Sequence, residues 1–219
     1  MVSITADATH FVNCSGKITI KDCLFENQID DATNIHGIYI QIDKIMSPRK
    51  PLVKLANSGQ YGFSMFKKGQ KKNIELVHSK SLITSGTATL DSITVLNKEY
   101  TLIYLDRDIP KDIQVKDVIA SAEEAVAVYI EGCTIQSNLA RGLLIGSRGK
   151  TVIKNNHFHV PGATILFEGD GRYWYEQAGV TDVLIKSNLF DNCVYGVWGN
   201  NVIQVGAGIG KDQRAKKPL

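Results

Sequence analysis

A short pattern of alternating apolar and polar positions recurs along the chain. Each copy has two apolar residues separated by one position, then two spacers, then a small or polar residue and another apolar position. The copies are centred on Ile20, Ile130, Ile153 and Ile185. Period-two alternation in runs of four to six residues, bounded by Gly and Asn, is typical of β-strands that meet at tight turns.

The spacing of the copies predicts how they stack. Ile130 and Ile153 are 23 residues apart, the length of one coil of a parallel β-helix, in which each coil buries its inward side chains against its neighbours. We therefore expect an all-β fold of this class, a right-handed parallel β-helix (solenoid), with the four isoleucines in one inward column. A ladder of small or polar side chains is expected beside that column, formed by Cys23, Cys133, Asn156 and Asn188.

Two longer intervals interrupt the repeat. The interval between Ile20 and Ile130 is far longer than one coil and contains short strand-like runs at 80–84, 92–96 and 100–104, which predicts an inserted antiparallel β module. The expected boundaries are a first β-helical part at 1–44, the module at 45–117, a second β-helical part at 118–210 and a basic tail at 211–219. The interval from Ile153 to Ile185 also exceeds one coil, by a smaller amount, which predicts that the loop 168–179 lies outside the regular coil.

Composition narrows the functional classes. The net charge is only +3, and much of it lies in the tail, so a nucleic-acid partner is not expected. No apolar run reaches the length of a membrane span, and no signal peptide is recognisable. The four cysteines lack C-x-x-C spacing and are interpreted as buried thiols. Neither a complete phosphate-binding loop nor a four-ligand metal motif is present, so no cofactor and no metal are expected.

Three aspartates are the strongest candidates for chemistry. Asp7 precedes Asp30 by 23 residues, one coil, and should lie about one strand spacing from the Asp30–Asp31 pair. The interval from Cys23 to Gly37 is also longer than its counterparts, which suggests a polar bulge ending at His36. Crowded carboxyls raise the pKa of one of them, and glycoside hydrolysis needs one protonated and one ionised carboxyl.

The loop 168–179 supplies further polar and aromatic side chains, among them Glu168, Asp170 and Trp174. A sugar stacks its apolar face on an aromatic ring while its hydroxyl groups form hydrogen bonds. This loop is therefore a candidate for substrate binding, although packing of its aromatic residues on the coil beneath would explain it equally well.

Several stretches resemble glycoside hydrolase family 110. They are 11–17, 28–37, 140–144, 165–170 and 179–183, and the string Asp-Asp-x-Thr-Asn-Ile-His-Gly at 30–37 is the most specific of them. Members of that family are bacterial exo-acting alpha-1,3-galactosidases, including enzymes that remove the terminal galactose of the blood-group B antigen. The family's β-helix carries small β-barrel domains, so the resemblance implies that the inserted module is barrel-like.

The resemblance also implies roles for individual residues. An inverting mechanism is expected, with Asp30 as the general acid and with Asp7 and Asp31 activating water. The substrate-side candidates are His36, Arg148, Glu168, Asp170 and Trp174. The partner implied is a galactose-terminated glycan, no metal or cofactor is required, and the location implied is secreted, periplasmic or cell-surface in a bacterium.

Family members are much longer than 219 residues, so we expect this sequence to be an internal fragment or a truncated gene with weak activity by itself. Two other functions stay open. A β-helix that only binds glycans would not need Asp7 in register with Asp30. A polygalacturonase-type hydrolase would keep the aspartates and favour basic residues in the pocket, where Arg148 and Arg172 are compatible with it.

Overall fold

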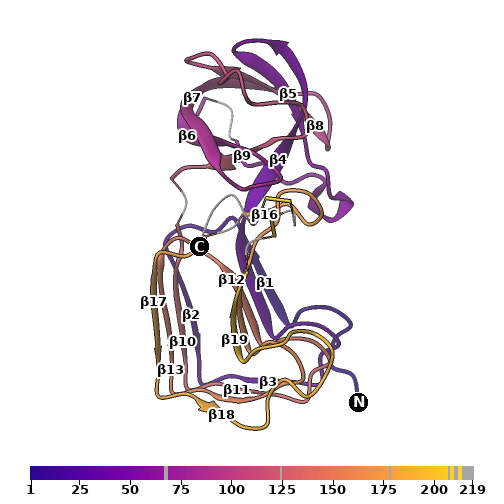
Figure 1. The fold of residues 1–219 in the computed structure, drawn as a ribbon, viewed down its shortest axis with the longest axis vertical. Helices are drawn as coiled ribbons and strands as arrows, with labels where there is room; N and C mark the ends of the chain where they lie inside the picture. The colour runs from indigo at the N-terminus through magenta and orange to yellow at the C-terminus, as the bar shows by residue number, and fades with distance from the viewer. Residues whose placement is uncertain (67–68, 124, 178, 207, 210–211, 214–219) are drawn as a thin grey trace. The chain divides into compact units, whose positions relative to one another are not determined.

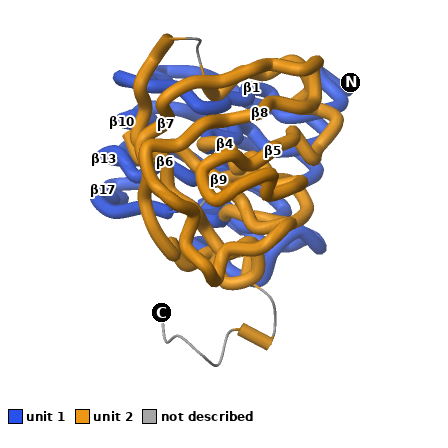
Figure 2. The backbone as a smooth tube through the Cα atoms, turned by 90° about the horizontal axis from the view of Figure 1, so that it is seen from above, with its two compact units in different colours: residues 1–36, 125–168, 178–207 blue, residues 37–124, 169–177, 208–219 orange. Residues whose placement is uncertain are grey.

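A computed structural model describes residues 1–66, 69–123, 125–177, 179–206, 208–209 and 212–213. The chain forms two compact units (Figure 2). Unit 1 comprises Met1–His36, Ala125–Glu168 and Ala178–Ala207, and unit 2 comprises Gly37–Glu124, Gly169–Gln177 and Gly208–Leu219. The basic tail expected at 211–219 lies outside the described residues, except for 212–213.

Unit 1 is built from three sheets of parallel strands (Figure 1). The first contains β2 (Lys17–Lys21), β10 (Ala127–Glu131), β13 (Lys150–Lys154) and β17 (Asp182–Lys186). The second contains β3 (Leu24–Glu26), β11 (Thr134–Gln136), β14 (His157–His159) and β18 (Leu189–Phe190). The third contains β1 (Thr9–Val12), the start of β4 (Thr33–Ser47), β12 (Leu143–Gly146), β15 (Ile165–Phe167) and β19 (Ile203–Val205).

The strand register confirms the predicted pairing of the repeats. Ile20 pairs with Ile130, Ile130 with Ile153, and Ile153 with Ile185. These side chains share the core of unit 1 with aromatic residues of the second sheet, where the rings of Phe158 and Phe190 stack at 5.4 Å. The strands β2 and β10 bury the alternate positions that the period-two pattern marked.

The predicted side-chain ladder is also present. Asn156 is buried, accepts a hydrogen bond from the backbone N–H of Cys133 (2.9 Å) and donates to the carbonyl of Ile130 (3.0 Å). Its side-chain amide also donates to Asn188 Oδ1 (3.0 Å). The interpretation of all four cysteines as buried thiols is wrong, because only Cys133 is buried and Cys23 is exposed; all four are free.

Unit 2 is a closed antiparallel barrel of six strands. In order around the barrel, β4 pairs with β5 (Lys50–Lys54), then come β8 (Tyr100–Leu105), β7 (Thr84–Val95), β6 (Lys72–Val77) and β9 (Val118–Ser121). The ring closes because β9 pairs with β4, with Tyr39 opposite Ala120. Its fully buried apolar side chains include Ile42, Ile74 and Ile103.

The expected fold class is therefore corrected. The chain is an all-β protein with a closed six-stranded barrel and separate parallel sheets, and a right-handed β-helical solenoid is not the class that the structure shows. The barrel strands pair with antiparallel neighbours and carry no repeat. The sequence period therefore reflects only the parallel strands, and the fold class predicted from it left the barrel out of account. The run at 80–84, predicted as a strand, is the turn between β6 and β7, and only its last residue begins β7.

Two smaller elements complete unit 2. A single 3-10 turn, η1 (Ser58–Gln60), is capped by the Asn57 side chain, and β16 (Glu176–Gln177) pairs with β4 at Gly37 and Ile38. Most of the loop predicted to leave the regular coil, residues 169–177, thus belongs to unit 2. In the described part of the chain, no helix has the length and hydropathy of a membrane span.

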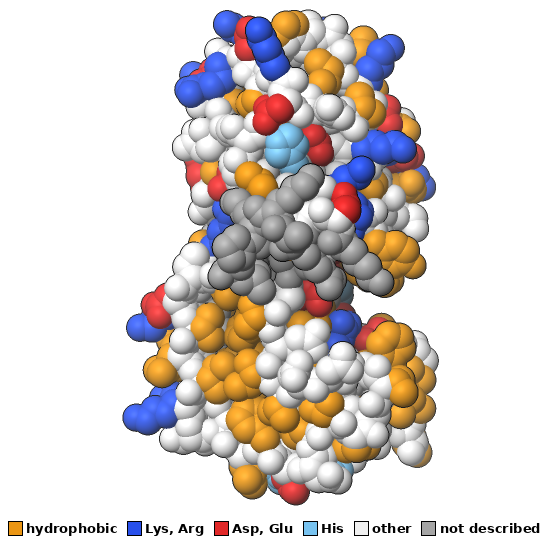
Figure 3. Space-filling model, viewed as in Figure 1, with side chains coloured by type: hydrophobic (Ala, Val, Ile, Leu, Met, Phe, Trp, Pro, Cys, Tyr) orange, Lys and Arg blue, Asp and Glu red, His pale blue; other side chains and the backbone are white. Residues whose placement is uncertain are grey.

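Apolar side chains are exposed on one edge of the parallel sheets. The strands β17, β18 and β19 end their sheets and carry Leu184, Leu189, Ile203 and Val205, each between 44% and 63% exposed. Figure 3 shows hydrophobic side chains gathered on the lower half of the visible face, the half in which Figure 1 labels these strands. Exposed apolar edges of this kind are typical of surfaces that associate with other strands.

Candidate active site

Asp7, Asp30 and Asp31, here called the aspartate cluster, lie together in unit 1. Parallel pairing of β1 with β4 sets Asp7 beside Asp31, so the backbone N–H of Asp31 donates to Asp7 Oδ1 (3.1 Å). The backbone N–H of Ala8 donates in return to the Asp31 carbonyl (3.0 Å). One carboxylate oxygen from each of the three aspartates lies within 4.8 Å of the others. The structure thus brings the three predicted residues together.

The register differs from the predicted one by a residue. Thr9 pairs with Thr33, an offset of 24, whereas the offset between β10 and β13 is the predicted 23. Asp7 therefore faces Asp31 instead of Asp30. The prediction of a lengthened loop between Cys23 and Gly37 is wrong. Leu143 pairs with Thr33, so the residue opposite Gly142 is Ala32 and not Gly37.

Asp31 is held by a buried ion pair. Its carboxylate accepts two parallel hydrogen bonds from the Arg141 guanidinium, Nε to Oδ1 at 2.9 Å and Nη2 to Oδ2 at 2.8 Å. The backbone N–H of Arg141 also donates to Oδ1 (3.0 Å). Burial raises the pKa of Asp31 from 3.8 to about 6, because the loss of hydration outweighs the attraction of Arg141; Asp7 and Asp30 add smaller increments in the same direction.

The three carboxyls differ in their access to a ligand. The Asp31 side chain is 1% exposed and that of Asp7 is 12% exposed, while Asp30 is an exposed residue. The Asp30 carbonyl accepts from the Asn138 side chain (3.2 Å), which also donates to the Arg141 carbonyl (2.6 Å). Asn138 therefore ties the turn that carries Asp30 to the segment that carries Arg141.

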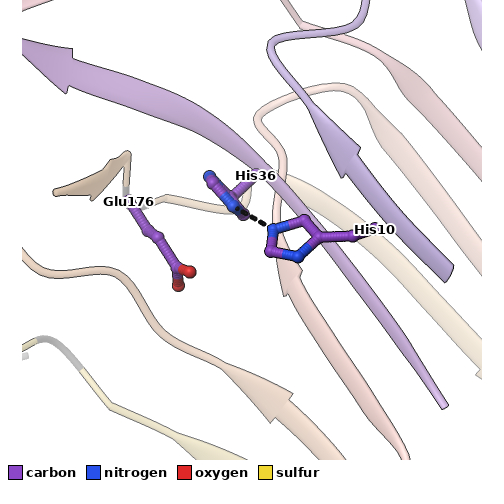
Figure 4. Close-up of side chains that lie close together, drawn as sticks. All are labelled: His10, His36 and Glu176. Carbon is purple, nitrogen blue, oxygen red and sulfur yellow. Dashed lines mark hydrogen bonds between the residues drawn. The ribbon is translucent and has the colours of Figure 1, made fainter. Parts of the chain in front are cut away.

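Two histidines extend the site from Asp7. His10 Nδ1 lies 3.1 Å from Asp7 Oδ2, and His10 Nε2 lies 2.8 Å from His36 Nε2 (Figure 4). With a proton on His10 Nδ1 directed at the carboxylate, His10 Nε2 accepts from His36. The result is a hydrogen-bonded chain from His36 through His10 to Asp7. His36 itself is buried on β4, so the predicted polar bulge at this residue is a strand.

Glu168 and Arg148, two predicted substrate-side residues, also belong to unit 1. Burial lowers the pKa of Arg141, but the nearby carboxylates raise it by more, so the net shift is upward. These carboxylates are Asp31, Asp30 and Glu168, so Glu168 lies within electrostatic reach of Arg141. Arg148 lies against Gly179, and its carbonyl accepts from the Thr181 hydroxyl (2.6 Å).

Asp170 and Trp174 belong to unit 2. The Asp170 carboxylate accepts hydrogen bonds from the backbone N–H groups of Arg172, Tyr173 and Trp174, at 3.0, 2.6 and 2.6 Å, so it shapes its own loop. Trp174 is 56% exposed and lies edge-to-face against Tyr173, with ring centroids 4.8 Å apart. An exposed aromatic pair of this kind suits a sugar face.

Sequence reasoning assigned no role to Arg141, His10 or Asn138. Arg141 stood inside a stretch that carried the family resemblance, which was the one available signal. The positive charge of Arg141 also bears on metal binding: carboxylate oxygens suit a hard cation, but the guanidinium already bonds both oxygens of Asp31. Arg141 therefore organises the aspartate cluster through both oxygens of Asp31.

A cavity of about 190 Å³ lies elsewhere, in unit 2. Its lining is mainly apolar, including Val53, Phe63 and Met65, and Lys98 and Glu99 also contribute. None of the predicted site residues lines it. The candidate active site is therefore defined by the aspartate cluster and its partners.

Comparisons with known proteins show which proteins the chain resembles. Residues 52–119, most of the barrel, match the family described as GLAA-B beta-barrel domain II. Alpha-1,3-galactosidase A of Shewanella woodyi is 35% identical over 89% of this chain. Most of the chain is similar to alpha-1,3-galactosidases A and B. The resemblance drawn from the sequence is thereby confirmed.

Two further relatives show the same extent of similarity. Alpha-1,3-galactosidase B of Bacteroides thetaiotaomicron is 33% identical over 84% of the chain, and alpha-1,3-galactosidase A of Bacteroides fragilis is 30% identical over 94%. The chain spans about a third of the length of these curated relatives, with 32%, 30% and 34% of the three covered. The similarity therefore extends over most of this chain.

Proposed function

We propose that this protein is a glycoside hydrolase that removes terminal alpha-1,3-linked galactose from glycans. The observation that carries the proposal is the aspartate cluster, in which one exposed carboxyl, Asp30, stands beside two carboxyls held by hydrogen bonds. Glycoside hydrolysis uses such a pair of carboxyls, one to protonate the leaving oxygen and one to act at the sugar carbon or on water. The named activity of the relatives supports galactose as the sugar removed.

Asp30 is proposed as the general acid, because an acid must touch the leaving oxygen and Asp30 is the exposed member of the cluster. Asp7 is proposed as the base that activates water. Its Oδ1 accepts from the Asp31 N–H and its Oδ2 faces His10, so its orientation is fixed before substrate binds. His36 in turn holds the His10 ring that faces Asp7.

The stereochemical course is proposed from the family resemblance, because the carboxyl separation in this structure is shorter than inversion requires. Inverting enzymes keep acid and base carboxyls about 6.5–9.5 Å apart, and retaining enzymes about 5–5.5 Å. The closest oxygens of the cluster lie within 4.8 Å, so an inverting course requires the exposed Asp30 side chain to turn away from Asp7 when water and sugar enter. We propose inversion, with this movement of Asp30. Proton NMR of the first product tests it, since inversion of an alpha-galactoside gives beta-galactose and retention gives alpha-galactose.

The activity test compares Asp30→Asn with an unchanged protein and with Asp22→Asn, an exposed aspartate of unit 1 whose side chain is 71% exposed. Galactose release from an unactivated alpha-1,3-galactoside should fall by about 10²- to 10⁴-fold in Asp30→Asn, because a general acid contributes that much. Asp22→Asn should stay at the unchanged rate. A near-normal rate for Asp30→Asn removes Asp30 as the acid.

The same assay separates the alternative functions. Release of galacturonate from polygalacturonate, without release of galactose, would favour a polygalacturonase-type hydrolase. Binding of galactose that is unaffected by Asp30→Asn, without turnover of either substrate, would favour a glycan-binding protein. Galactose release that depends on Asp30 supports the proposal.

A further inference from the structure

Among the described residues, Arg141 is the cationic side chain that bonds directly to the aspartate cluster. It reaches Asp31 from a segment 110 residues further along the chain and forms both parallel hydrogen bonds and a backbone hydrogen bond with it. Its own side chain is 29% exposed, against 1% for Asp31. A bidentate guanidinium–carboxylate contact fixes both distance and orientation, so the geometry of Asp31 is set by Arg141.

Both oxygens of Asp31 are thus occupied, and this residue has no exposed surface to offer water or sugar. A group that activates water must meet that water, directly or through one other molecule. Asp31 is therefore poorly placed for the role in water activation that the family resemblance suggested. Its backbone N–H is the part that acts on the cluster, because it donates to Asp7 Oδ1.

The charges around the cluster define a proton balance. The groups that face it are the carboxylates of Asp7, Asp30 and Asp31, the Arg141 guanidinium, the Glu168 carboxylate near Arg141 and the His10 imidazole at Asp7. When several carboxyls crowd together, they bind fewer protons than there are carboxyls, and one of them takes up a proton more readily than the others. A buried carboxyl is the natural holder of that proton unless a cation opposes it.

We propose that Arg141 is a positioning residue that keeps Asp31 ionised and holds the Asp30–Asp31 turn against Asp7, so that the proton for the leaving oxygen is carried by the exposed Asp30 and not by the buried Asp31. The inference rests on the proposed hydrolase function and goes beyond it by assigning the position of the proton. Asn138 supports the same arrangement, since it bonds both the Asp30 and the Arg141 carbonyls.

The electrostatics of the pair agree with this role. Burial alone raises the pKa of Asp31, and the charge and hydrogen bonds of Arg141 lower it, with about 6 as the balance. At pH 7 a carboxyl of that pKa is ionised about ten to one. Without Arg141 only the raising influences remain, so the pKa of Asp31 rises further and this buried carboxyl takes up a proton more readily.

The test uses the full chain with Arg141→Met, Arg141→Lys and, as a matched control, Arg49→Met. Arg49 pairs with Asp108 at 2.6 Å in unit 2, with both side chains more than 60% exposed, so its loss should change neither readout. The first readout is the rate on an unactivated alpha-1,3-galactoside against the rate on nitrophenyl alpha-galactoside, whose leaving group needs little protonation. The second is the pKa of Asp31 from carboxyl carbon NMR, which does not depend on turnover.

We expect Arg141→Met to lower the rate on the unactivated galactoside by about 10²-fold or more and the nitrophenyl rate by less than about tenfold. The pKa of Asp31 should rise by at least about one unit, and Arg141→Lys should fall between Arg141→Met and the unchanged protein on both readouts. Equal losses on both substrates would overturn the proposal, because a merely structural residue affects both alike. An unchanged Asp31 pKa in Arg141→Met would overturn it too.

The design separates this inference from the proposed function. If the unchanged protein releases no galactose, the hydrolase proposal fails, while the Asp31 titration still decides whether Arg141 sets the ionisation of that carboxyl. If Arg141→Met does not fold, the titration of Arg141→Lys decides instead. A raised Asp31 pKa in Arg141→Lys then supports the inference, and a value equal to that of the unchanged protein refutes it.

Discussion

Replacing Asn156 by Ala should destabilise unit 1 more than the same replacement of Asn188, the other asparagine of its side-chain ladder. Asn156 is 2% exposed and its side chain makes three hydrogen bonds, to the Cys133 N–H, the Ile130 carbonyl and Asn188 Oδ1. The first two of these partners belong to residues in the core of unit 1. Truncation leaves a buried N–H and a buried carbonyl without their side-chain partner.

The magnitude follows from those two groups. A buried polar group that loses its partner costs about 1–3 kcal/mol, so Asn156→Ala should lower the free energy of unfolding by about 4 kcal/mol. Domains of this size are stable by only about 5–15 kcal/mol, so the loss is large. Asn188 donates to the Ile153 carbonyl (2.9 Å) but is partly exposed, and water can replace its contacts. Asn188→Ala should therefore cost about 1–2 kcal/mol.

The assay is urea unfolding followed by far-ultraviolet circular dichroism, combined with amide hydrogen exchange to assign the loss to unit 1. Asn200→Ala, an exposed asparagine of the same unit, is the control and should stay within about 0.5 kcal/mol of the unchanged protein. The reasoning is refuted if Asn156→Ala costs less than about 1 kcal/mol, or if Asn188→Ala costs more than Asn156→Ala.

Two other predictions concern titration and thiol access. Because burial raises the pKa of Asp31 to about 6 in the folded protein, against 3.8 unfolded, the folded state binds more protons between these values. The free energy of unfolding should fall by up to about 3 kcal/mol from this residue as the pH rises from about 4 to 6, and Asp31→Asn should lack that slope in urea titrations at each pH. Cys23 should react with a maleimide in the native protein, whereas Cys133 should react only after unfolding; equal native rates, measured by mass spectrometry, would contradict the burial assignment.

The repeat predicted which strands of unit 1 pair. Positions that recur in the sequence, such as Ile20, Ile130 and Ile153, occupy the same place in successive strands because identical patterns of apolar side chains bury best when stacked. The ladder of Cys133, Asn156 and Asn188 followed from the same comparison. The local sequence pattern was sufficient to predict these pairs, because each strand repeats the apolar pattern of its neighbour.

The aspartate cluster was predictable in its members and not in its detail. Spacing close to one coil was enough to bring Asp7 near the Asp30–Asp31 pair. Whether Asp7 faces Asp30 or Asp31 depends on a single residue of register, and successive coils differ by that amount, 24 in one sheet and 23 in another. A shift of one residue exchanges the two faces of a strand, so an approximate period leaves the facing residue undetermined.

The barrel and the ionisation of the site were decided by tertiary structure alone. The six strands of unit 2 have no common period, and closure depends on β9 meeting β4 across a long sequence separation. Asp31 and Arg141 are 110 residues apart, and nothing in either local sequence marks them as partners. Apolar periodicity is a property of the local sequence, so it can be recognised without a structure. The burial and pairing of a charged side chain depend on segments that are distant in sequence and meet only in the folded protein.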